Sequence, residues 1–197
     1  MLGFSGMIIR HLEFRQIGLE LFNLGYNNSH SGNISICKNK DIFITHTGSM
    51  LHRLKPWDIV RINNNQSGKK DKEASMELPV HRTIYTSAKN AEAVIHAHAP
   101  YSIAMADGKE QIIPYDHEGL HYFKSIPIIT VSCGIASKEV AECISQYTNT
   151  NNSVIVAKHG IFAWGKDLNE ALKYLTVTES ICRLNFLMEA RNVTKNN

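Results

Sequence analysis

The stretch Ala93-Val94-Ile95-His96-Ala97-His98 combines a strand pattern with a chemical signal. Its apolar start predicts a short buried strand over residues 93–98 that ends in two histidines. Side chains two positions apart along a strand point to the same face of the sheet. We therefore expect His96 and His98 to reach one and the same metal ion.

A catalytic zinc ion usually takes three protein ligands and keeps a fourth position open. His159 is the best candidate for the third ligand, because it follows an apolar strand predicted at 153–157 and precedes Gly160. An isolated His-x-His pair is more often a structural feature than a metal site. Motifs elsewhere in the chain must therefore decide whether this pair binds a metal ion. We expect six other histidines to be hydrogen-bonding or surface residues: His30, His46, His52, His81, His117 and His121.

Outside this strand, segments of strand and helix periodicity follow one another irregularly. Strands are predicted at 34–37, 41–45, 58–62, 128–131 and 153–157, and helices at 11–25, 79–88, 137–146 and 168–190. Asp167 is a suitable N-cap for the last helix. The pattern predicts one α/β domain over residues 1–197, with a mixed or mainly antiparallel central sheet and helices on its faces.

Composition and charge are those of an ordinary folded protein. Apolar residues make up 43% of the chain and charged residues 20%, with a net charge of +3. The densest basic run, Lys69-Lys70-Asp71-Lys72, is interrupted by an acid, so we expect no nucleic-acid partner. No segment reaches the ~18 consecutive apolar residues of a membrane span. The four cysteines form no C-x-x-C pair, which favours reduced thiols and a cytoplasmic location.

Five short motifs occur in order along the chain, and together they resemble the class II aldolase and adducin family. The resemblance covers roughly residues 10–190. Each motif is weak alone, but five motifs in the order found in the family are strong evidence for the resemblance. The motifs are Ser31-Gly32-Asn33-Ile34-Ser35, Ile44-Thr45-His46-Thr47-Gly48, Ser75-Met76-Glu77, Val94-Ile95-His96-Ala97-His98-Ala99 and Lys158-His159-Gly160.

The resemblance implies a metal site and a catalytic carboxylate. His96, His98 and His159 match the three zinc ligands of the family, and Glu77 matches its acid/base residue. One Zn²⁺ per subunit is expected, and Mn²⁺ or Co²⁺ would suit the same donors. Without the family match, Glu77 would be read as a charge that stabilises a helix N-terminus.

The resemblance also implies a binding site for a substrate phosphate. Turns at Gly32-Asn33 and Thr47-Gly48 offer N–H groups, a hydroxyl and an amide, and such turns can bind anions. The start of a helix near Ser75 adds a favourable dipole. The four positions implied are Asn33, Thr47, Gly48 and Ser75.

The family fold is an α/β/α sandwich around a mainly antiparallel sheet, and most of its aldolases and epimerases are homotetramers with active sites at subunit interfaces. The implied activity is a zinc-dependent aldolase that cleaves a ketose 1-phosphate, such as fuculose 1-phosphate or a related deoxypentulose phosphate, to dihydroxyacetone phosphate and an aldehyde. The implied partners are a small phosphorylated sugar and further copies of the chain.

Other functions occur on the same scaffold. A dehydratase of the methylthioribulose-phosphate type and a sugar-acid phosphate decarboxylase share the metal and the glutamate, and rank second. The 4-epimerases usually carry an aspartate at the position of Glu77 and rank third. Adducin-like members are interaction modules that generally lose metal ligands, whereas this chain keeps all three histidines.

The chain departs from the family pattern in two segments that bear on the substrate. Family aldolases often carry a second serine at the position of Met76, so one phosphate-binding hydroxyl is missing. In the segment 114–119, Tyr115 or His117 is a candidate replacement for a tyrosine proton donor. The alternative is that Asp116-His117-Glu118 forms a surface turn.

Overall fold

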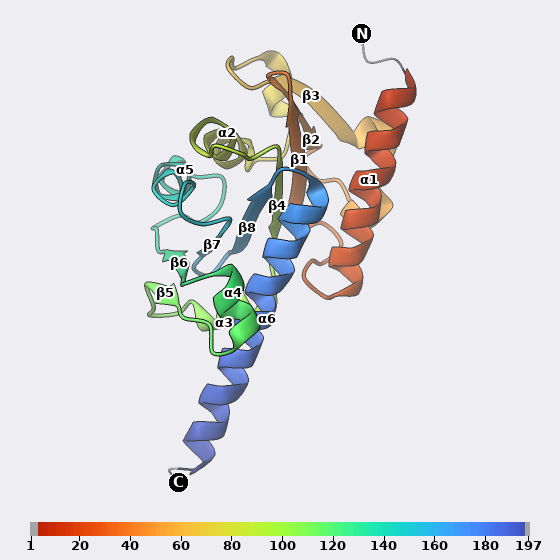
Figure 1. Cartoon of the computed structure of the whole chain (residues 1–197). Coiled ribbons are helices and arrows are strands. Elements are labelled where there is room, and N and C mark those ends of the chain that lie inside the picture. The colour runs from red at the N-terminus through yellow and green to blue at the C-terminus, as the bar shows by residue number, and fades with distance from the viewer. Residues whose placement is uncertain (1–3, 196–197) are drawn as a thin grey trace.

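A computed structural model describes residues 4–195, with side chains described over residues 10–192. One eight-stranded sheet runs through the molecule in the order β3-β2-β1-β4-β8-β7-β6-β5 (Figure 1). The strands are β1 Asn33–Lys38, β2 Asp41–Thr45, β3 Ile59–Asn63, β4 Ala93–Ala97, β5 Gln111–Ile112, β6 Ile126–Ile129, β7 Ser153–Val156 and β8 Gly160–Gly165.

The sheet is antiparallel except between β6 and β7, which run parallel. The mixed, mainly antiparallel sheet expected from the sequence is therefore confirmed. Strand β4 lies between β1 and β8, and all five of its residues are buried. The strand with the His-x-His pair is thus a central strand covered on both faces, which explains its continuous apolar run.

Helices cover the two faces of the sheet, as expected for an α/β/α sandwich (Figure 1). Phe14 of α1 and Leu175 of α6 belong to one apolar cluster, whereas Val80 of α2 and Val140 of α5 belong to another. No helix within the described residues is long and apolar enough to cross a bilayer. The helices are α1 Phe4–Asn23, α2 Leu78–Ser87, α3 Pro100–Met105, α4 His117–Tyr122, α5 Lys138–Ser145 and α6 Leu168–Lys195, with 3₁₀ turns at Leu51–Arg53, Pro56–Asp58 and Lys69–Lys72.

Local signals in the sequence account for several boundaries. Asn39 and Lys40 adopt positive φ in the short turn between β1 and β2, which matches a tight hairpin. The carboxylate of Asp167 accepts a hydrogen bond from the N–H of Glu170 at 2.8 Å, so the predicted N-cap of α6 is confirmed. The Ser137 hydroxyl caps α5 in the same way.

Four elements were not predicted from the sequence: α3, α4, β5 and β8. The two helices are six residues long and β5 is two residues long, so none shows a full period of apolar positions. Strand β8 begins and ends with glycine, which argues against a strand when the sequence is read alone. Its neighbours β4 and β7 supply the hydrogen bonds that hold it in the sheet.

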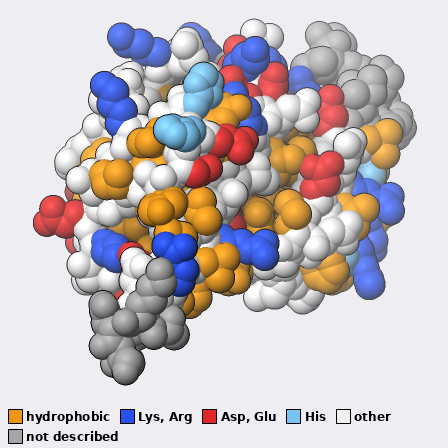
Figure 2. Space-filling view, turned by 60° about the horizontal axis from the view of Figure 1, so that its bottom comes forward, with side chains coloured by type: hydrophobic (Ala, Val, Ile, Leu, Met, Phe, Trp, Pro, Cys, Tyr) orange, Lys and Arg blue, Asp and Glu red, His pale blue; other side chains and the backbone are white. Residues whose placement is uncertain are grey.

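On the face drawn in Figure 2, Lys and Arg side chains alternate with acidic and apolar ones. The interrupted run at Lys69–Lys72 forms a 3₁₀ turn with exposed or half-buried side chains. Arg82 and Asp71 pair nearby at 2.7 Å, which fixes part of this connection to α2.

Candidate metal centre and its pocket

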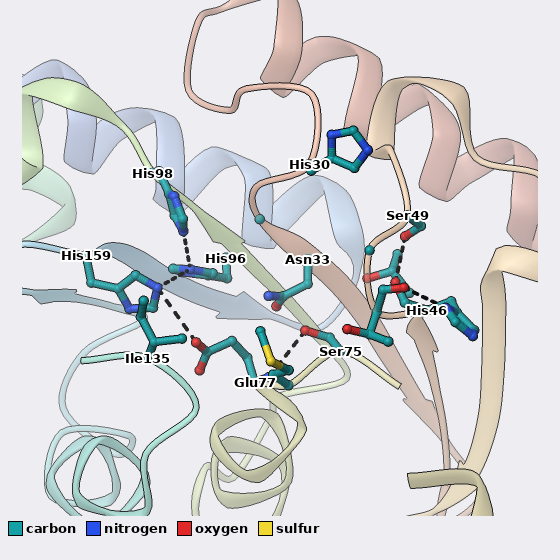
Figure 3. A pocket seen from close by; sticks show the side chains of 15 residues that line it. His30, Asn33, His46, Ser49, Ser75, Glu77, His96, His98, Ile135 and His159 are labelled. Atoms are coloured by element: carbon teal, nitrogen blue, oxygen red, sulfur yellow. Dashed lines mark hydrogen bonds and ion pairs between the residues drawn. The ribbon is translucent and has the colours of Figure 1, made fainter. Parts of the chain in front are cut away.

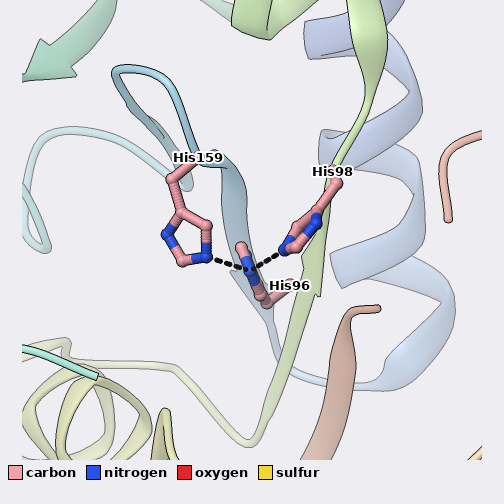
Figure 4. Close-up of side chains that lie close together, drawn as sticks. All are labelled: His96, His98 and His159. Atoms are coloured by element: carbon pink, nitrogen blue, oxygen red, sulfur yellow. Dashed lines mark hydrogen bonds between the residues drawn. The ribbon is translucent and has the colours of Figure 1, made fainter. Parts of the chain in front are cut away.

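Three histidines at the ends of neighbouring strands converge on one point (Figure 4). His96 lies in β4, His98 directly follows it, and His159 lies in the turn between β7 and β8. Strands β4 and β8 pair with Ala97 opposite Ile161, so the turn that carries His159 lies beside the end of β4. The sheet register thus assembles the group that the sequence pattern predicted.

The three Nε2 atoms lie close together. The Nε2 atom of His96 is 3.0 Å from that of His98 and 3.2 Å from that of His159. Two nitrogens bound to one tetrahedral zinc ion at ~2.05 Å are about 3.3 Å apart. The two separations from His96 are therefore nearly those that a shared ion requires, and all three nitrogens lie within 4.8 Å of one another.

Burial favours the neutral form of all three imidazoles. Desolvation lowers the pKa of His96 well below its usual value, lowers the pKa of His98, and lowers that of His159 to about 4. The Nδ1–H of His96 donates to the carbonyl oxygen of Ile161 at 2.9 Å, which leaves the Nε2 lone pair directed at the centre. Neutral rings with free lone pairs are the form that binds a metal ion.

Glu77 lies beside this centre, at the N-terminus of α2. It is 4% exposed, its Oε1 lies 3.7 Å from Nε2 of His159, and the backbone N–H of Ala136 donates to the same oxygen at 3.0 Å. Burial raises the pKa of Glu77 to about 7, although the hydrogen bond from Ala136 opposes the rise. Since His159 is neutral, the contact between the two side chains is not an ion pair.

The second carboxylate oxygen of Glu77, Oε2, is buried and has no hydrogen-bond partner among the described residues. An unpaired buried oxygen is costly, and a cation or a proton donor would relieve the cost. Together with the converging nitrogens, this oxygen shows that the residues present fit a divalent metal ion. Figure 3 shows Glu77 directed toward the histidines from the opposite side of the pocket.

The histidines and Glu77 line one end of a cavity of about 210 Å³ (Figure 3). Asn33, Thr47, Gly48 and Ser75 line the same cavity, so all eight site residues predicted from the sequence lie in one pocket. Tyr115 and His117 are not among its lining residues. His117 begins helix α4, and the side chain of Asp116 caps that helix.

The backbone N–H groups expected to bind an anion are only partly available. The N–H of Thr47 donates to the carbonyl of Glu73 at 2.9 Å, and that of Ser75 donates to the carbonyl of Thr45 at 2.9 Å. These bonds tie the two turns together. Thr47 can therefore contribute its hydroxyl but not its N–H, which corrects the expectation of a backbone nest at this residue. Gly48 lines the pocket, has φ +72 and has no heavy atom within 4 Å of where a Cβ atom would lie.

Sequence reasoning missed several features of the pocket, which is also lined by His30 and His46. Ala136, with φ +52, supplies the N–H that holds Glu77, and Ile135 forms an exposed apolar edge. His81 was expected to be a hydrogen-bonding or surface residue, and it is a hydrogen-bonding one: it is fully buried, and its Nε2 lies 2.6 Å from Oδ1 of Asn33. His81 lies one helical turn after Glu77, and this spacing was the available signal for it.

Comparison with known proteins identifies the family of this chain. The family described as Class II Aldolase and Adducin N-terminal domain matches residues 13–186. The chain is 32% identical to an L-fuculose phosphate aldolase of Methanococcus vannielii, covering 89% of this chain and 95% of that protein. It is 23% identical to a 3-oxo-tetronate 4-phosphate decarboxylase of Escherichia coli, covering 92% and 88% respectively.

Among solved structures, an L-fuculose-1-phosphate aldolase from Thermus thermophilus superposes with a TM-score of 0.85 at 28% identity. The match covers 95% of this chain and 96% of that one. The histidine cluster, the layered fold and the match over nearly the whole length agree with one another. The chain belongs to the class II aldolase and adducin family.

Proposed function

We propose that this protein is a metal-dependent aldolase that cleaves a ketose 1-phosphate, such as fuculose 1-phosphate or a related deoxypentulose phosphate, to dihydroxyacetone phosphate and an aldehyde. The observation that carries the proposal is Glu77, a buried carboxyl group 3.7 Å from one of three converging, neutral imidazoles. The names of the relatives from Methanococcus and Thermus support the same reaction class, a carbon–carbon lyase.

His96, His98 and His159 are proposed as the ligands of one Zn²⁺ per chain, with Mn²⁺ and Co²⁺ as alternatives that suit nitrogen donors. When bound, such an ion would stabilise the negative charge that develops beside a carbonyl as the carbon–carbon bond breaks. Because the three ligands are neutral, they leave the positive charge of the ion undiminished. His96 is only 1% exposed, and a desolvated setting of this kind strengthens that electrostatic effect.

Glu77 is proposed as the group that moves the proton. A carboxyl group with a pKa of about 7 is present in both acid and base forms near neutral pH, which suits general acid–base catalysis. In the cleavage direction the hydroxyl group that becomes the aldehyde gives its proton to water as the carbon–carbon bond breaks, and the acid form of Glu77 donates a proton to the carbon that keeps the bonding electron pair. Water then returns a proton to Glu77. The hydrogen bond from Ala136 fixes one oxygen and leaves Oε2 for this transfer.

The other end of the pocket is proposed to bind the phosphate through Asn33, Thr47, Gly48 and Ser75. The amide and hydroxyl groups there donate hydrogen bonds without adding a formal charge. Met76 is 65% exposed at the rim, in the position where family aldolases often have a second serine. We expect phosphate binding to be weaker than in an aldolase that has both serines.

A sugar-acid phosphate decarboxylase is the second candidate, and the Escherichia coli relative favours it. Loss of carbon dioxide beside a carbonyl develops the same negative charge as aldol cleavage, so the histidines and Glu77 would serve either reaction. An adducin-like interaction module would need neither a complete set of metal ligands nor a buried carboxyl group beside it.

The testing experiment is a retro-aldol assay of metal-loaded protein on a panel of ketose 1-phosphates, with and without chelator, detecting dihydroxyacetone phosphate. We expect chelator-sensitive release of that product. No release from protein that carries about one metal ion per chain would reject the aldolase, and a 3-oxo acid phosphate substrate would then test for decarboxylation. Protein that binds no metal would reject both enzymes in favour of a binding module.

We further propose that the chain forms one domain and works in the cytoplasm as a homo-oligomer, with a tetramer favoured. Light scattering of the purified protein would measure the mass of the assembly. A mass equal to one chain would reject the assembly while leaving the proposed reaction untouched.

A further inference from the structure

A chain of short hydrogen bonds runs from the interior of the molecule to the pocket. The Tyr85 hydroxyl lies 2.6 Å from Oγ of Ser35, and the same Oγ lies 2.6 Å from Nδ1 of His81. The Nε2 atom of His81 lies 2.6 Å from Oδ1 of Asn33. Three polar side chains thus follow one another behind Asn33, although none of them lines the cavity.

This chain of hydrogen bonds connects two neighbouring elements. Ser35 and Asn33 are on the same face of β1, two residues apart, whereas His81 and Tyr85 are one turn apart on α2. Ser35 and His81 are both fully buried. Buried polar groups of this kind must all be paired, and a fully paired network fixes the orientation of each member.

The direction of the hydrogen bonds follows from the chemistry of their members. Burial lowers the pKa of His81 to about 3, so its ring is neutral and carries one N–H. The amide oxygen of Asn33 can only accept, and Nε2 of His81 must therefore donate to it. The Nδ1 atom then accepts from the Ser35 hydroxyl, which in turn accepts from the Tyr85 hydroxyl.

The orientation of the Asn33 amide decides what the pocket offers to a ligand. With its oxygen bound by His81, Asn33 has its NH₂ group left for the cavity, between the histidines and Ser75 (Figure 3). An NH₂ group donates to anionic oxygens. The flipped amide would present a carbonyl oxygen, which repels them.

We propose that His81 is a positioning residue that, held by Ser35 and Tyr85, locks the Asn33 amide as a hydrogen-bond donor and so makes this end of the pocket selective for an anionic oxygen group. The inference rests on the proposed function in one respect, namely that the pocket binds a phosphate. His81 contacts neither the substrate nor the metal centre, and it acts only through Asn33.

The first measurement is direct and needs no ligand. Nitrogen-15 NMR of the histidine rings shows which ring nitrogen carries the proton. The signals of His81 are assigned by comparison with the His81→Gln variant. We expect a proton on Nε2 and none on Nδ1. A proton on Nδ1 would mean that the chain of hydrogen bonds runs the other way, and it would overturn the proposal whatever the substrate is.

The second measurement is calorimetric binding of inorganic phosphate to the metal-loaded protein. His81→Leu removes the donor, and we expect phosphate to bind about tenfold or more weakly, in line with a lost hydrogen bond to a charged group. His81→Gln can place an amide N–H near the position of Nε2 and should restore most of the affinity. In the aldolase assay, the loss should appear in KM more than in kcat.

Thr178→Val is the matched control, because it removes a buried 2.8 Å hydrogen bond to Ser153 far from the pocket. It should lower stability without changing phosphate binding. Equal phosphate affinity in wild type and His81→Leu would overturn the proposal while leaving the proposed function intact. A wild-type protein that binds metal but not phosphate would overturn the phosphate end of the proposed function, and this inference with it.

Discussion

At the scale of single residues, Glu77 has the most unusual environment in the pocket. Its carboxyl group is buried beside three neutral imidazoles, with one oxygen bound to the N–H of Ala136 and the other unpaired among the described residues. A residue at a helix N-terminus would usually be exposed and ionised. The turn 75–77 instead directs this side chain inward, which raises its pKa to about 7.

We expect Glu77→Gln to lower kcat by about 10²- to 10⁴-fold, the usual contribution of a general acid or base. The amide keeps the size and the hydrogen bond of the carboxyl group but cannot move a proton. Steady-state kinetics would measure the change, with metal content per chain as the control. A kcat near that of the wild type in fully metal-loaded Glu77→Gln would reject the role of Glu77.

The same substitution should change how stability depends on pH in metal-free protein. The folded-state pKa of Glu77 is raised from 4.5 to about 7, so the folded protein holds this proton more tightly than the unfolded chain does. The stabilising effect of the protonated Glu77 carboxyl group is therefore present below pH 4.5 and is lost as the pH rises through 7. At pH 8, burial of the ionised carboxylate costs up to about 3 kcal/mol.

We accordingly expect Glu77→Gln to be more stable than the wild type at pH 8 and nearly equal to it at pH 4.5. Urea unfolding at the two pH values would measure the difference. The histidines, whose pKa values are lowered, make the opposite contribution to the pH dependence of stability. This contribution cancels when wild type and Glu77→Gln are compared at the same pH. A difference that is the same at both pH values would contradict the assigned environment of Glu77.

At the scale of elements, the close approach of β4 and β8 determines where His159 lies. Gly160 has φ +153, and a Cβ atom there would lie 2.3 Å from the carbonyl oxygen of Ala97. Only glycine permits this contact, because an L side chain would force the strands apart. The residue that follows His159 is therefore as important for the proposed metal centre as the proposed ligands.

We expect Gly160→Ala to lower the free energy of unfolding by about 3 kcal/mol or more and to weaken metal binding. Gly108→Ala is the matched control, since Gly108 has φ +69 but no heavy atom within 4 Å of where a Cβ atom would lie. Gly108→Ala should lower the free energy of unfolding by about 1–2 kcal/mol through backbone strain and leave metal affinity unchanged. Metal titration and urea unfolding of both variants would check this, and equal metal affinity in Gly160→Ala would contradict it.

At the scale of the whole molecule, the candidate metal centre joins segments that are far apart in the chain. His98 and His159 are separated by α3, β5, α4, β6, α5 and β7, and α2 brings Glu77 to the same point. An ion held by these segments binds the folded chain and not the unfolded one, so it should stabilise the whole domain.

We expect metal at 100 times its Kd to stabilise the protein by about 2.7 kcal/mol, and chelator to remove this stabilisation. Thermal unfolding with and without chelator would measure the effect. His159→Ala should lose both the metal and the chelator response. An equal shift in His159→Ala and wild type would reject His159 as a ligand.

The sequence by itself determined the parts of the fold and site that rest on local patterns. The apolar run before His96 requires a buried strand, and the i, i+2 spacing places His98 on the same face. The caps at Ser137 and Asp167 set the starts of α5 and α6. The ordered motifs identified the family and eight of the residues that line the pocket.

Only the tertiary structure decided the features that depend on contacts between distant segments. The Ala136 N–H that holds Glu77 and the hydrogen bonds from Tyr85 to Asn33 join residues far apart in the chain. The Thr47 N–H donates to the carbonyl of Glu73 and is therefore not available to an anion, and this hydrogen bond also depends on how two turns meet. The physical reason is that burial, pKa and hydrogen-bond direction are set by what packs around a group, whereas local spacing sets only the face on which it lies.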